Sequence, residues 1–90
     1  MNTEFFINSR YKVLYCMASC QIQVNGMKIV PLTQQQIANE VGLSKKKVNS
    51  IVAELKAEGY IVQQNQTRGK YILTTAAESI LAYIEETEVQ

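Results

Sequence analysis

The sequence predicts a mostly helical α+β fold in a single domain over residues 1–90, with three helices, a short strand, a β-hairpin and a C-terminal helix. Ninety residues, 47% of them hydrophobic, suit one compact core. Apolar residues recur at helical spacing in four segments, and residues 60–74 are rich in Tyr, Ile and Val. The composition, with 19% charged residues and one proline, is not that of a disordered chain.

The first helix is expected from Asn8 to about Gln23. Between Val13 and Cys20 its apolar side chains occupy nearly the whole circumference. A helix of this kind is covered on two sides, and a small domain covers only one of them. We therefore expect a homodimer that forms through the first and last helices.

Two further helices are expected on either side of a three-residue turn. The second helix begins at Thr33, which forms a capping box with Gln36. It ends at Gly42, because glycine enters the left-handed conformation without steric cost. The third helix runs from its cap, Ser44, to Glu58.

Extended structure is expected in two places. A turn at Asn25-Gly26 leads into a short strand at residues 28–30. The hairpin of residues 60–74 closes around a loop that contains Arg68. The last helix then opens at Thr75, with which Glu78 forms a second capping box.

This order of elements resembles a winged helix-turn-helix, and the resemblance spans nearly the whole chain. Ala38 falls where the two helices touch, Gly42 falls at the turn, and Ile37, Val48 and Ile51 fall at inward apolar positions, as in bacterial repressors. Downstream, the segments EGYIV and YILTTAAESIL resemble the wing and following helix of MarR-like and related winged-helix regulators.

The resemblance implies that the chain is a small bacterial, phage or plasmid transcriptional regulator that binds double-stranded DNA sequence-specifically. The helix at about 44–58 would enter the major groove, and the wing at about 60–74 would contact the backbone or the minor groove. Asn49 and Ser50 are expected to contact bases, and the lysines to contact phosphates. The expected DNA-binding residues are Ser44, Lys45, Lys46, Lys47, Asn49, Ser50, Arg68 and Lys70.

Three lysines at positions 45–47 stand where a helix disfavours cations. Free N–H groups and the macrodipole make a helix N-terminus partly positive, and a misplaced charge there costs about 0.3–1 kcal/mol. Approaching phosphates would reverse this balance, so the local conflict indicates a functional surface. The structural alternative is a solvated helix start.

The formal net charge of +1 hides an uneven distribution. Residues 44–70 contain six basic residues against two glutamates, whereas the last twenty residues contain four glutamates and no basic residue. The pattern indicates a basic face for phosphate and an acidic end turned away from it. Chance clustering on a solvated surface is the alternative.

No enzymatic activity, cofactor or metal is expected. The chain has no histidine, no aspartate and no glycine-rich phosphate loop, and two cysteines alone are too few for a zinc site within one chain. Cys16 and Cys20 share a helix face; they are expected to serve as packing residues, and a thiol-based sensor is the alternative.

The rival class of function is a winged helix that serves as a protein-protein interaction module in a larger assembly. The clustered lysines favour DNA over that role, since an interaction wing tends to expose apolar or mixed-charge residues. No apolar run approaches the roughly 18 residues of a transmembrane helix, and the N-terminus lacks the features of a signal peptide. A cytoplasmic location without membrane contact is therefore expected.

Overall fold

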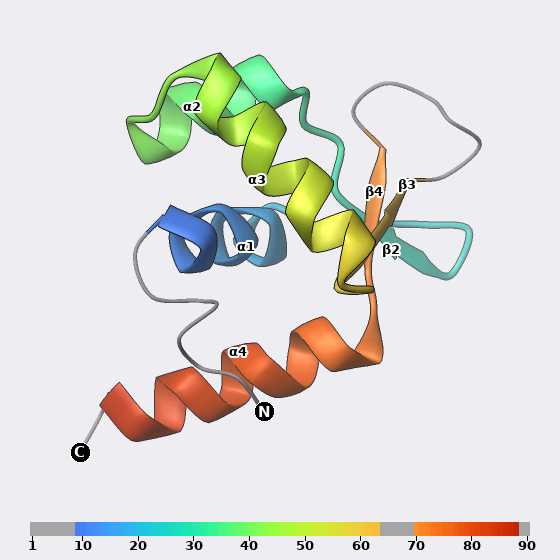
Figure 1. The fold of residues 1–90 in the computed structure, drawn as a ribbon. Coiled ribbons are helices and arrows are strands. Elements are labelled where there is room, and N and C mark those ends of the chain that lie inside the picture. The colour runs from blue at the N-terminus through green and yellow to red at the C-terminus, as the bar shows by residue number, and fades with distance from the viewer. Residues whose placement is uncertain (1–8, 64–69, 89–90) are drawn as a thin grey trace.

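The computed structural model describes residues 9–63 and 70–88, which form four helices and two antiparallel two-stranded sheets (Figure 1). This arrangement confirms the predicted fold class, a winged helix-turn-helix with a C-terminal helix. The elements in chain order are α1 (Ser9–Ser19), β1 (Ile22–Val24), β2 (Met27–Ile29), α2 (Gln34–Val41), α3 (Lys45–Ala57), β3 (Ile61–Gln63), β4 (Tyr71–Leu73) and α4 (Thr75–Glu88).

Helix α1 lies at the centre of the core and contacts α2, α3 and α4. Its residues Val13, Leu14 and Met17 are fully buried. Figure 1 shows α4 running beneath α1, on the side opposite α2. The apolar circumference of α1 is therefore covered to a large extent within the chain itself.

The predicted end of the first helix is wrong, because α1 ends at Ser19 and not near Gln23. Asn25 and Gly26 both have positive φ, 52° and 78°, as a two-residue hairpin turn requires. This turn pairs β1 with β2 in antiparallel register. Ile22 continues the helical spacing of apolar residues, but the turn at Asn25-Gly26 places it in a strand instead. It is 48% exposed there.

Val30 joins the two sheets. The strand predicted at residues 28–30 is β2, displaced by one residue, and Val30 itself forms an isolated antiparallel bridge with Tyr71 of β4. The Val30 N–H donates to the Tyr71 carbonyl at 2.8 Å, and the Tyr71 N–H donates to the Val30 carbonyl at 3.3 Å. The bridge fixes the wing strands against the segment that leads into α2.

The helix-turn-helix forms as predicted. Thr33 and Gln36 make both hydrogen bonds of the capping box, and Gly42 has the left-handed conformation with φ 74°. Ser44 caps α3, because its Oγ accepts from the Lys47 N–H at 3.0 Å. The inward residues of the motif are all buried: Ile37, Ala38, Val48 and Ile51.

The capping box predicted at Thr75 is wrong, because Thr74 caps α4. The Thr74 Oγ accepts from the Ala77 N–H at 3.3 Å, and the same hydroxyl donates to the Gly59 carbonyl at 2.8 Å. β4 ends just before Thr74, so this residue has the junction position that a cap needs. One hydroxyl therefore connects the end of α3 with the start of α4.

Thr74→Val should lower the free energy of unfolding by about 1–3 kcal/mol, because it removes both the cap and the hydrogen bond to Gly59. Urea denaturation measures the change. The matched control is Thr75→Val at an exposed position, which should stay within about 0.5 kcal/mol of the native protein. Equal losses in the two variants would contradict the role of Thr74 as the cap.

Candidate nucleic-acid interface

The starts of α2 and α3 and the wing strands surround an open groove of about 700 Å³, which we call the α3 groove. Three segments that lie far apart in the sequence thus contribute to one concave surface. Most of its side chains are amides or amines. The lining residues are Thr33, Gln34, Gln35, Lys45, Lys46, Asn49, Gln63 and Tyr71.

Three of the predicted DNA-binding residues, Lys45, Lys46 and Asn49, line this groove together. They come from the first two turns of α3, and all three are exposed. Lys47 and Ser50 are also exposed but lie outside the lining. The structure therefore brings together part of the predicted set on one side of α3.

Two further predicted residues, Ser44 and Lys70, do not line the groove. The Ser44 hydroxyl is engaged as the cap of α3. Lys70 is exposed just before β4. Arg68 and the loop around it lie outside the described residues.

Sequence reasoning missed the glutamines of the α3 groove. Gln34 Nε2 donates to the Tyr71 hydroxyl at 3.4 Å, and Lys56 Nζ donates to Gln63 Oε1 at 2.6 Å. The sequence offers one signal for a polar site here, the glutamine run that includes Gln34 and Gln35. This run falls in the first turn of α2, which also has free backbone N–H groups. The position of Gln63 opposite α3 depends on how the wing folds back, which no local pattern indicates.

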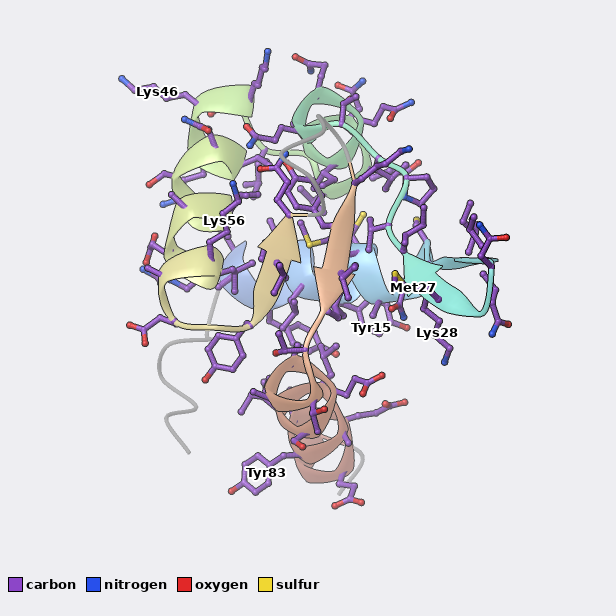
Figure 2. The ribbon with its side chains drawn as sticks, turned by 90° about the vertical axis from the view of Figure 1, so that its right-hand side faces the viewer. Tyr15, Met27, Lys28, Lys46, Lys56 and Tyr83 are labelled. Carbon is purple, nitrogen blue, oxygen red and sulfur yellow. The ribbon has the colours of Figure 1, made fainter. Side chains whose placement is uncertain are left out.

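The lysines at the start of α3 have no neutralising partner among the described residues. Neither Lys45, Lys46 nor Lys47 takes part in an ion pair there, and the first turn of α3 has no acidic residue. In Figure 2, Lys46 projects away from the body of the protein. The positive potential of the helix N-terminus and of the lysines thus adds up at this end of α3.

The carboxylate of Glu54, on α3, is engaged by α1. Arg10 Nε donates to Glu54 Oε2 at 2.9 Å, and a second guanidinium nitrogen contacts the same oxygen. The two side chains are 33% and 36% exposed, so the pair adds little to stability. The ion pair matters for the charge of α3. Arg10 compensates Glu54, the negative charge on α3 that lies nearest to Lys45, Lys46 and Lys47.

The acidic residues of α4 lie away from the lysines, as predicted. Glu78, Glu85 and Glu86 are exposed, and Figure 1 shows α4 across the domain from the start of α3. Tyr83 of α4 and Lys46 lie at opposite ends of the view in Figure 2. The domain therefore has positive charge at the start of α3 and negative charge on α4, on the opposite side.

The two cysteines, Cys16 in α1 and Cys20 in the turn just after its end, are free and half-buried. Burial, the neighbouring Cys20 and the charge of Glu40 raise the pKa of the Cys16 thiol from 9.0 to about 11. A thiol with this pKa is almost wholly protonated at neutral pH and is a poor nucleophile. This property favours packing over redox sensing for Cys16.

Neither a metal site nor a membrane span is found in the part of the chain that the structure describes. Within residues 9–63 and 70–88, no cluster of three or more His, Cys, Asp or Glu side chains is able to hold a metal ion. No helix in these ranges combines the length and apolar character needed to cross a bilayer.

The chain belongs to the Crp-like helix-turn-helix domain family, whose model matches residues 12–78. The predicted winged helix-turn-helix superfamily is thereby confirmed. The family within it is Crp-like and not specifically MarR-like. A comparison with curated protein sequences gave no significant match.

Solved structures share the fold. TubR bound to 24 bp of tubC, from Bacillus thuringiensis serovar israelensis pBtoxis, is 26% identical over 94% of this chain and 89% of its own, with a TM-score of 0.69. A mutant of the type III plasmid segregation protein TubR is 23% identical over 97% and 88%, with a TM-score of 0.70. A CRP/FNR-family transcriptional regulator from Thermus thermophilus is 18% identical over 83% of this chain, with a TM-score of 0.67. The match spans only 41% of that regulator.

Alkylation of Cys16 by iodoacetamide should accelerate about tenfold per pH unit up to about pH 10 without levelling off, because only the thiolate reacts. Mass spectrometry of the modified peptide measures the rate. In the urea-unfolded chain the rate should level off near the ordinary pKa of 9.0. A plateau below about pH 9 in the folded protein would show that the thiol is not shielded.

Proposed function

We propose that the chain is a cytoplasmic transcriptional regulator that binds double-stranded DNA sequence-specifically and without a cofactor. The observation that carries this proposal is the convergence of Lys45, Lys46 and Asn49 in the α3 groove of a Crp-like domain. The DNA bound to TubR, a protein 26% identical to this chain, supports it. In this proposal α3 enters the major groove and the wing contacts the backbone or the minor groove.

The proposed contacts divide into two kinds. The lysines at positions 45–47, with Lys70 and Arg68 of the wing, bind phosphates and supply affinity. Asn49 and Ser50 contact base edges and supply specificity. Ser44 contributes through the helix start that it caps, where free N–H groups also attract phosphate.

A second candidate function is DNA binding in plasmid segregation. TubR matches this chain over 89% of its own length, whereas the Thermus CRP/FNR regulator is matched over 41%. Mapping of bound sites in cells separates the two candidates. A single site beside a promoter favours regulation, and a repeated array whose removal causes plasmid loss favours segregation.

We further propose that the protein acts as a homodimer through α1 and α4. Tyr15 of α1 and Tyr83 of α4 are 52% and 46% exposed and offer apolar surface on these two helices. Two-fold symmetry would place two copies of α3 about 34 Å apart, the length of one DNA turn. Dimerisation would thereby let one protein read both halves of a palindromic site.

Replacing Lys45, Lys46 or Arg68 with Ala should weaken binding to specific and random DNA about equally. Each change should lower the slope of log affinity against log salt by about one. Fluorescence anisotropy over a salt series measures both quantities. Lys28→Ala is the control, because Lys28 is exposed on β2, well away from Lys46 in Figure 2.

Asn49→Ala should behave differently in the same series. It should cost about 1–3 kcal/mol on the preferred site and little on random DNA, with an unchanged salt slope. The lysine variants should be as stable as the native protein or slightly more so, because they remove charges that oppose the helix dipole. If the lysine variants are unstable while DNA binding and its salt slope stay unchanged, the lysines have a structural role and do not contact phosphate.

Sedimentation should detect a dimer at micromolar concentrations, and Tyr83→Glu should shift the equilibrium toward monomer because it places a charge in the proposed interface. Val62→Glu on the wing is the matched control, since Val62 is 52% exposed on β3, outside the proposed interface. A native protein that stays monomeric at high micromolar concentration would contradict the dimer.

A further inference from the structure

One line of side chains runs along the outer face of α3. Lys46, Asn49, Ser50 and Ala53 follow each other at the spacing i, i+3, i+4 and i+7, and all four are exposed. The opposite face of the helix is buried in the core: Val48, Ile51, Val52 and Leu55. We call the exposed line the reading stripe.

The chemistry of the reading stripe suits A·T base pairs. A side-chain amide such as that of Asn49 pairs with two atoms of adenine in the major groove, and an apolar side chain such as Ala53 contacts the thymine methyl. Past its first turn the stripe contains neither an arginine or lysine, which pair with guanine, nor a carboxylate, which accepts from cytosine. Its one cation, Lys46, stands in the first turn. Glu54, next to Ala53, is instead bound by Arg10 on the side of α1.

The geometry of the stripe allows both contacts in one site. Residues 49 and 53 are one helical turn apart, about 5–6 Å along the axis. Base pairs follow each other every 3.4 Å or so along DNA, so the two side chains reach base pairs about two steps apart. The small side chain of Ala53 also lets the helix backbone approach the base edges closely.

Lys46 at the first turn differs from these two residues. It lines the α3 groove with Lys45 and has no ion-pair partner among the described residues. Its flexible ammonium group suits a phosphate as a point charge. The stripe therefore consists of one cation followed by exposed neutral side chains.

We propose that α3 selects A·T base pairs, with Asn49 bound to an adenine and Ala53 in contact with a thymine methyl about two base pairs away. This inference rests on the proposed DNA-binding function and specifies the DNA that it recognises. Ala53 thereby becomes a residue that determines specificity.

The test starts with selection from a random-sequence duplex library by the native protein at fixed salt. The enriched site is then rebuilt with 7-deazaadenine for adenine, which lacks the ring-nitrogen acceptor, or with deoxyuridine for thymine, which lacks the methyl group. The 7-deazaadenine site should bind the native protein about fivefold or more weakly than the natural site. It should bind the Asn49→Ala variant as well as the natural site does. The deoxyuridine site should bind the native protein about two- to fourfold more weakly than the natural site. It should bind the Ala53→Gly variant as well as the natural site does.

The two analogues are tested on the native protein, so the result stands even if Ala53→Gly folds poorly. Salt-dependent DNA binding with G·C pairs enriched at these positions would overturn the A·T inference and leave the proposed function in place. Equal affinity for the analogues and the natural site would overturn it as well. Failure to bind any duplex, by contrast, would overturn the proposed function itself.

Discussion

The antiparallel bridge between Val30 and Tyr71 sets the geometry on which the candidate interface depends. Its two backbone hydrogen bonds, 2.8 and 3.3 Å long, connect the wing to the segment before α2. The Tyr71 side chain is 2% exposed, and its hydroxyl accepts from Gln34 at 3.4 Å at the edge of the α3 groove. The wing and the start of α2 are thus held at a fixed separation by backbone bonds and by one buried ring. The groove is consequently formed before any ligand arrives, which reduces the ordering cost of binding.

The start of α3 combines a stabilising cap with destabilising charges. The hydrogen bond from the Lys47 N–H to Ser44 Oγ is worth about 1 kcal/mol. Each lysine that opposes the helix dipole offsets part of this gain, by about 0.3–1 kcal/mol at low salt. Arg10 meanwhile neutralises Glu54, the acidic residue within α3. The free domain therefore retains an uncompensated positive charge at this helix end, which an anion such as the DNA backbone relieves.

The sequence predicted the parts of the fold that are determined locally. Thr33, Gly42 and Ser44 mark helix ends through bonds within a few residues, and these ends are correct. The end of α1 was wrong because two local signals compete there, and cross-strand pairing at Asn25-Gly26 decides between them. In the α3 groove, Lys45, Lys46 and Asn49 were predicted from their positions on one helix. The contribution of Gln63 was not, because it depends on tertiary contacts between the wing and α3.

The all-round apolar surface of α1, which predicts a dimer, is mostly covered within the chain by α2, α3 and α4. The side of α4 around the exposed Tyr83 is therefore the better candidate for the dimer interface. α4 contains exposed Glu78, Glu85 and Glu86 and has no basic residue, so two copies that meet there bring like charges together. Salt would screen this repulsion and strengthen such a dimer. The same salt weakens binding of the lysines to phosphate, so the two interfaces would respond to ionic strength in opposite directions.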